Sequence, residues 1–196
     1  MAGLSSQRMR RIKVKRAATA SILIALCIAT NYALLYVPNV KLMDMLVFVS
    51  GFVFGIWTGV AVGAFSWLVY GTINPLGFSL PTLASTMIGE TIYGVTGALL
   101  GHTWLRTKSS EWKASFSIKN LGFGLVGLMT TLLYDLFTNA VTGIIFYNSV
   151  WLGLLTMNFP LPMGILHEAS NFLLFASICP LIIISVKRTL NGFNNK

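Results

Sequence analysis

The chain has 196 residues, of which 55% are apolar and 10% are charged, and its formal net charge is +9. Soluble domains carry roughly 25% charged residues, and a mean hydropathy of +0.76 leaves too little charge to cover the surface of a 21.4 kDa globule. An ordinary soluble domain is therefore excluded, and the composition predicts an all-α integral membrane protein. The basic residues form short clusters between long uncharged stretches, as topology signals do, which argues against nucleic-acid binding.

The first predicted element is a membrane helix over residues 17–40, which follows a basic tail at residues 1–16. This helix region contains 24 consecutive residues without a charge. A secretory signal has a shorter apolar region of about 7–15 residues and a cleavage pattern of small residues, which this segment lacks. We therefore predict a transmembrane helix that is retained.

The second uncharged stretch, residues 45–89, allows two interpretations. A cluster of helix breakers, Asn-Pro-Leu-Gly at 74–77, interrupts it. Residues 45–73 form either one tilted helix about 43 Å long or two short helices that reverse direction near residues 55–59. Glycines recur every four residues from 51 to 63 and favour the single helix, because they make one continuous packing stripe.

Three further stretches are each long enough to cross a hydrocarbon core of about 30 Å. They are residues 82–104, 121–147 and 162–186. With the two earlier stretches they give five or six spans.

The distribution of Lys and Arg decides between these counts, because basic residues in short loops accumulate on the cytoplasmic side. Six spans with an internal N-terminus put 13 of the 14 basic residues inside, including those of the loop 106–119, and leave only Lys41 outside. Five spans leave eight outside. We therefore predict a bundle of six transmembrane helices with cytoplasmic N- and C-termini, in which residues 17–187 form one membrane domain and residues 188–196 a cytoplasmic tail.

Small residues recur every four positions along the first predicted helix, which places them on one face. They are Ala17, Ser21, Ala25, Ala29 and Ala33. Such a face lets another helix approach closely. That second helix belongs either to this chain or to a partner, and the pattern leaves both possibilities open.

Polar side chains fall at similar depths in three predicted helices. At 1.5 Å per residue, Glu90, Asp135 and Asn139 lie about 12–18 Å below the outer helix ends, and His167 and Asn171 about 8–14 Å. Polar groups inside a membrane are costly, so they face a cavity or one another. We predict a substrate pocket that opens to the outside, with a purely structural hydrogen-bond network as the alternative. Its predicted wall contains Glu90, Tyr93, Asp135, Asn139, His167 and Asn171.

Aromatic residues gather near the same end of the predicted bundle. Trp67 and Tyr70 lie three residues apart on one helix face and are suited to stack on a planar ligand, so we add them to the predicted pocket. Trp151 and Phe159 fit an interfacial aromatic belt instead.

No catalytic or metal centre is predicted. The run from His167 to Asn171 has an amide where the helix of a zinc peptidase needs its second histidine, and the chain contains no G-x-S-x-G elbow or P-loop. Cys27 and Cys179 stand singly in apolar stretches without metal-ligand spacing. The chain is therefore predicted not to be an enzyme and to need no cofactor, so that energy for transport comes from a partner or an ion gradient.

Several segments together resemble a known family. The sequence PNVKLMD at 38–44, followed by GFVFGIWTGVAVG at 51–63, is similar to the second and third helices of S components of energy-coupling factor transporters. The alanine ladder of helix one, the polar fifth helix with YDLFTN at 134–139 and the length of the chain agree with this resemblance.

The resemblance implies a membrane subunit that captures a vitamin or similar micronutrient from outside. In that family, the small-residue face of helix one docks on a T-component membrane subunit driven by two ABC-type ATPases, which makes Ala25 and Ala29 the candidate docking residues here. The pocket of such proteins is built from outer loops and helices four to six. A branch that binds cobalt or nickel has a histidine at position two, which this chain lacks.

Two other classes of protein are weighed against this expectation. A proton-coupled secondary carrier is favoured by Glu90 and Asp135, although such carriers show internal repeats or broken helices. A small membrane enzyme acting on lipid head groups needs paired acidic motifs, whereas the acids here are scattered singly.

Charge balance predicts the nature of the cargo. Glu90, Asp135 and Glu168 lie in the predicted outer half with Asp44 at its rim, against the single nearby cation of Lys41. A carboxylate-bearing ligand needs Arg or Lys to offset its desolvation. We therefore expect a cationic or neutral heterocycle, similar to thiamine.

Overall fold

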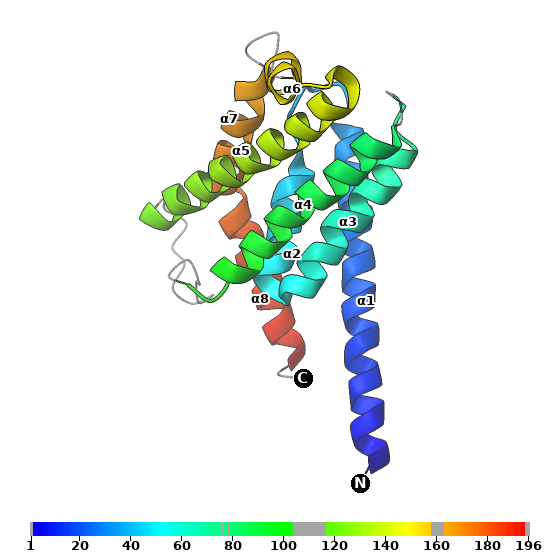
Figure 1. The fold of residues 1–196 in the computed structure, drawn as a ribbon. Coiled ribbons are helices and arrows are strands. Elements are labelled where there is room, and N and C mark those ends of the chain that lie inside the picture. Colours follow the sequence, from blue (N-terminus) through cyan, green and yellow to red (C-terminus); the bar gives the residue numbers. More distant parts are fainter. Residues whose placement is uncertain (1, 76, 78, 104–116, 158–162, 195–196) are drawn as a thin grey trace.

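The computed structural model describes residues 2–75, 77, 79–103, 117–157 and 163–194, and the secondary structure within these ranges is entirely helical (Figure 1). The helices are α1 (Ala2–Ala33), α2 (Leu42–Phe54), α3 (Ile56–Thr72), α4 (Leu80–Leu100), α5 (Ile118–Tyr147), α6 (Val150–Met157), α7 (Met163–Ser177) and α8 (Cys179–Asn194). The prediction of an all-α protein is confirmed for these residues. Most of the loop 106–119 lies outside them.

The predicted order of helices corresponds to the observed order with two differences. The first five predicted helices match α1 to α5, whereas the sixth, predicted over 162–186, is divided into α7 and α8. The short helix α6 was expected as part of an outer loop.

When each helix is judged individually by its length and hydropathy, few are identified as able to span a membrane. Among the described helices, α5 alone is long and apolar enough to cross a membrane, and α7 with α8 passes the same test only as a pair bent by 42°. The six-span bundle is therefore not established by the individual helices.

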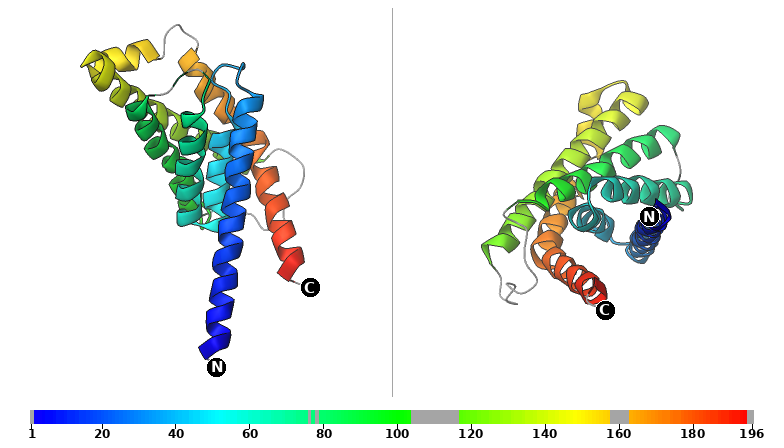
Figure 2. Two further views of the ribbon diagram at one scale, coloured as in Figure 1. Left: turned by 90° about the vertical axis from the view of Figure 1, so that its right-hand side faces the viewer. Right: turned by 90° about the horizontal axis from the view of Figure 1, so that it is seen from below.

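The helix α1 is longer at its start and shorter at its end than predicted. Residues 2–16, expected as a tail, continue the helix and project away from the bundle (Figure 2). At the other end α1 stops at Ala33 instead of reaching residue 40. Pro38 disfavours helical conformation at Val37, so the chain leaves the helix in turns and enters α2 at Leu42.

The chain reverses direction at Gly55, which separates α2 from α3. Gly55 has φ +93°, a left-handed conformation that L side chains rarely adopt. A β-carbon built on Gly59 would lie 2.8 Å from the Cα atoms of both Gly51 and Gly94. In one continuous helix Gly51 and Gly59 would stand about 12 Å apart. The interpretation with two short helices is therefore correct, and the glycines serve the close contact of α2, α3 and α4.

The bend between α7 and α8 has an identifiable cause at Pro180. Proline has no N–H group, so it cannot donate to the carbonyl oxygen of Ala176 one turn earlier. The side-chain amide of Asn120, on α5, donates to that oxygen instead at 2.8 Å. A side chain of the neighbouring helix α5 thus supplies the hydrogen bond that the break removes.

The helix α2 forms the centre of the bundle. Its residues from Met43 to Phe52 are all buried, and it packs against α1, α3, α4, α7 and α8. Phe48 and Phe52 join Phe123 and Phe175 in one aromatic cluster. Both chain ends lie at one end of the bundle, and the connection from α1 to α2 lies at the opposite end, together with α6 (Figure 1).

Candidate functional site

A cavity of about 700 Å³ lies at the end of the bundle away from the two termini. Residues from α3, α4, α5, α7 and the segment before α2 form its wall. They are Asn39, Lys41, Trp67, Thr82, Thr86, Tyr134, Asp135, Thr138, Asn139, Thr142, Phe146, Tyr147 and His167.

Helical spacing explains why α5 contributes most of this wall. Asp135, Thr138, Thr142 and Phe146 follow one another at intervals of three or four residues and so share one face of α5. Thr82 and Thr86 are related in the same way on α4. The cavity is the space between these two polar faces.

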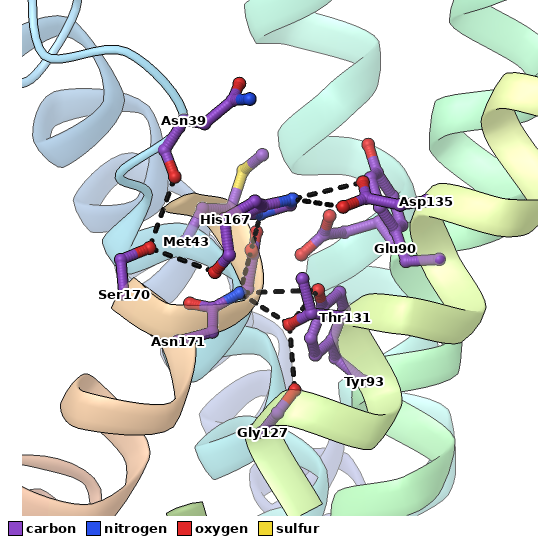
Figure 3. A network of polar contacts seen from close by, with 12 residues as sticks. Asn39, Met43, Glu90, Tyr93, Gly127, Thr131, Asp135, His167, Ser170 and Asn171 are labelled. Carbon is purple, nitrogen blue, oxygen red and sulfur yellow. Dashed lines mark hydrogen bonds and ion pairs between the residues drawn. The ribbon is translucent and has the colours of Figure 1, made fainter. Parts of the chain in front are cut away.

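A histidine in the cavity wall bridges two carboxylates, and Figure 3 shows its contacts with one of them, Asp135. The Nδ1 atom of His167 lies 2.9 Å from Oδ2 and 3.0 Å from Oδ1 of Asp135. Its Nε2 atom lies 2.8 Å from Oδ2 of Asp44. Since the three residues stand on α7, α5 and α2, this chain of contacts ties three helices together.

The bridge also fixes a proton count. A neutral imidazole carries one N–H group, yet both ring nitrogens of His167 face carboxylate oxygens. A second proton is needed, either on the ring or on one of the carboxyl groups. In both cases the group of Asp44, His167 and Asp135 carries a net charge of −1.

Asn171 extends the bridge toward α4. Its side-chain amide donates to Oδ2 of Asp44 and to Oγ1 of Thr131, each at 2.7 Å. The hydroxyl of Tyr93 donates to the same Thr131 oxygen at 2.9 Å. All these groups are buried, so the polar network is internal (Figure 3).

Glu90 is held separately from this network. The indole Nε1 of Trp67 donates to its Oε2 atom at 2.8 Å, and the carboxylate is fully buried. The ring of Trp67 also meets the ring of Tyr70 edge to face, with centroids 5.5 Å apart. Glu90 therefore supports the aromatic wall of the cavity from behind.

The predicted pocket residues divide into two groups. Trp67, Asp135, Asn139 and His167 line the cavity. The others form a buried layer behind that wall, so the predicted pocket and the alternative of a structural network are both present, at different depths. The buried layer consists of Tyr70, Glu90, Tyr93 and Asn171.

Several residues of the cavity wall and of the buried layer behind it were not among the predicted pocket residues. Asp44, expected at the rim, is 1% exposed and bonded to His167 and Asn171. Tyr134 and Thr138 line the cavity beside Asp135, although the sequence analysis did not predict them as pocket residues. Lys41 was treated only as a nearby charge, although its position as the single basic residue of the outer half was a usable signal.

The wall offers several kinds of interaction to a ligand. The hydroxyls of Thr86 and Thr138 donate to carbonyl oxygens of their own helices, which leaves their oxygen atoms able to accept hydrogen bonds. Trp67 and Tyr134 offer aromatic faces, and Lys41 offers a positive charge. Such a mixture is typical of a site that binds an organic small molecule.

No family model, curated protein or solved structure matches this chain.

Proposed function

We propose that this chain is the substrate-binding membrane subunit, or S component, of an energy-coupling factor transporter. In this proposal it lies in the cell membrane with both termini in the cytoplasm and captures a vitamin-like micronutrient from outside. A T-component membrane subunit and two ABC-type ATPases supply the energy. The observation that carries the proposal is the exposed small-residue face of α1, on the same bundle that holds the polar cavity.

Membrane residence is supported by an inverted distribution of side chains. Asp44, Glu90 and Asn171 are almost completely buried, whereas large apolar side chains stand on the outside. Exposed apolar residues occur on α3, α4, α5 and α7, for example Trp57, Ile88, Leu133 and Leu173. A surface of this kind requires lipid or a partner protein rather than water.

The docking role of α1 is supported by the orientation of its two faces. Cys27 and Asn31 are buried, and Ile24 and Ile28 pack against the core. The small residues Ala17, Ser21, Ala25, Ala29 and Ala33 are all exposed. They are not used for packing within this chain, so the closely approaching helix that such a face accommodates is provided by a partner.

Purification from native membranes tests the proposal. We expect a T component and two ABC-type ATPases to co-purify with the tagged chain. Recovery of the folded chain from its native membranes without any ATPase contradicts the proposal.

Substitution of the docking face separates capture from transport. Ala25→Leu and Ala29→Leu are expected to abolish uptake and ATPase association while leaving substrate binding within about twofold of wild type, because a bulky side chain holds the two helices apart. Ala18→Leu is the matched control, since it lies on the adjoining exposed stripe that already carries Ile22 and Leu26. Normal uptake by both ladder variants contradicts a docking role.

A proton-coupled secondary carrier is the second candidate, favoured by one observation. The buried bridge of Asp44, His167 and Asp135 holds a proton between two carboxylates next to the cavity, and the helix that carries His167 is broken after Ser177. Uptake that persists in ATP-depleted cells and stops on addition of a protonophore favours the carrier. Uptake that requires ATP and is unchanged by the protonophore favours the S component.

A further inference from the structure

We infer that the ligand of this cavity carries an anionic oxygen group, a carboxylate or a phosphate, and that Lys41 binds it beside the rings of Trp67 and Tyr134. This inference rests on the proposed function, in which the cavity holds the transported substrate. It replaces the expectation of a cationic or neutral cargo that followed from counting charges along the sequence.

The position of Lys41 is the first argument. Lys41 directly precedes α2 in an extended conformation and lines the cavity. Its Nζ atom lies 5.1 Å from the ring centroid of Trp67 and 5.8 Å from that of Tyr134. The ammonium group is therefore turned toward two wall residues of the cavity rather than toward bulk solvent.

The second argument is that the neighbouring carboxylates are engaged elsewhere. Asp135 and Asp44 each contact one ring nitrogen of His167 at hydrogen-bond distance, and Asp44 also accepts a hydrogen bond from the side-chain amide of Asn171. Glu90 accepts from the indole of Trp67. Within the described part of the chain, no oxygen lies close enough to Lys41 to form an ion pair or a hydrogen bond with it.

The third argument concerns what the aromatic faces can still accept. A ligand cation would bind best over the faces of Trp67 and Tyr134, but the ammonium of Lys41 already lies there and repels a second positive charge. Three ammonium N–H groups without acceptors instead favour a ligand that brings negatively charged oxygen.

The charges behind the wall do not remove this preference. Asp44, His167 and Asp135 together carry one net negative charge, which offsets Lys41 at a distance. Both oxygens of Asp135 and Oδ2 of Asp44 contact the ring nitrogens of His167. The remaining Oδ1 of Asp44 has no partner, but it is buried and Asp44 does not line the cavity, whereas Lys41 does. Direct recognition of a ligand charge therefore falls to Lys41.

Ligand capture from a cell extract tests the inference. Purified wild-type protein is dialysed against a small-molecule extract of the cells that produce it, and the retained compounds are identified by mass spectrometry in both ion modes. The same dialysis is carried out with Lys41→Met, which keeps an apolar stem, and with Lys41→Arg, which keeps the charge. Lys119→Gln, at the start of α5 and away from the cavity lining, is the matched control.

The expected result is a retained compound that is an anion at neutral pH. We expect Lys41→Met to lower its retention at least about tenfold, since it loses a charge-assisted contact, and Lys41→Arg and Lys119→Gln to retain it. If Lys41→Met does not fold, the charge of the compound retained by the wild-type protein still shows whether the ligand is an anion.

Two results overturn the inference, and they are distinguishable. A retained cation or neutral compound, or an anion that Lys41→Met retains fully, refutes the anionic assignment but leaves substrate capture intact. If folded wild-type protein retains no compound, the proposed capture function fails and the inference fails with it.

Discussion

At the scale of single residues, the wall of the cavity depends on His167, whose ring touches carboxylates from two other helices. Its partner Asp44 also accepts from Asn171, so one buried carboxylate serves two donors. Removing one member of a buried charged pair is costlier than replacing the whole pair, because the remaining group is left charged and unpaired. The bridge is therefore the part of the site most sensitive to substitution.

Asp44→Ala is predicted to destabilise the protein strongly. It leaves Nε2 of His167 without its carboxylate and Asn171 with one acceptor fewer, and such losses cost about 3–5 kcal/mol. Thermal unfolding in detergent measures the effect. Asp44→Asn keeps an oxygen acceptor in the same place and is expected to retain more of the stability. Equal midpoints for wild type and Asp44→Ala would show that the bridge contributes nothing.

At the scale of elements, two breaks decide the geometry of the bundle. The reversal at Gly55 brings Gly51 and Gly59 against Gly94, which lets three helices meet with almost no side chain between them. The bend at Pro180 divides the last predicted helix and leaves a carbonyl oxygen that Asn120 satisfies.

The pairing of Asn120 with the bend at Pro180 predicts a specific coupling. In the wild type, Asn120→Ala removes the donor to Ala176 and should cost about 1–3 kcal/mol for the unsatisfied buried oxygen. In a Pro180→Ala background the new backbone N–H can donate to that oxygen, so the same substitution should cost less. A double-mutant cycle by unfolding in detergent measures the difference. Asn120 also caps the start of α5, since its Oδ1 accepts from the backbone N–H of Ser117, and the loss of this contact cancels in the cycle. Identical costs in both backgrounds would contradict this account of the bend.

At the scale of the whole molecule, the bundle separates two ends. The chain termini lie at one end and the cavity at the other (Figure 1). The basic N-terminal segment and Lys187 belong to the first end, and Lys41 belongs to the second. This separation agrees with the charge count along the sequence, which puts 13 of 14 basic residues on one side.

Cysteine labelling in intact cells tests the topology. The native thiols of Cys27 and Cys179 are buried, so they give little background. Tyr36→Cys, at a position that is 92% exposed near the cavity, should react with a membrane-impermeant maleimide added from outside. Ser109→Cys and Thr103→Cys should react only after the cells are opened, because the charge bias puts them inside. External labelling of Ser109→Cys would refute the six-span topology.

Two of the central helices are too short to cross a membrane by themselves. The helices α2 and α3 have 13 and 17 residues, about 20 and 26 Å, which is less than a hydrocarbon core of about 30 Å. A helix such as α2, enclosed by five others, is surrounded by protein and does not need to match the lipid thickness. The proposed membrane location therefore does not require every helix of the bundle to span the lipid by itself.

The sequence by itself determined the helical class, the order of the main helices and some of the residues that line the cavity. Periodicity and composition are local properties, so the polar face of α5 with Asp135 and Asn139 could be predicted from spacing alone. Glu90, Tyr93 and Asn171 were predicted as pocket residues because polar groups are costly inside a membrane, and the structure buries them behind the cavity wall.

Only the tertiary structure decided which of these groups meet one another and which face the cavity. Asp44 and His167 are 123 residues apart in the chain, and nothing in either local pattern indicates their contact. The charge that a ligand meets depends on these pairings, since a carboxylate already bonded to a histidine no longer opposes an anion as a free one does. Counting acids along the sequence therefore favoured a cationic cargo, whereas their three-dimensional pairing is the basis on which we infer that Lys41 recognises the charge of the ligand.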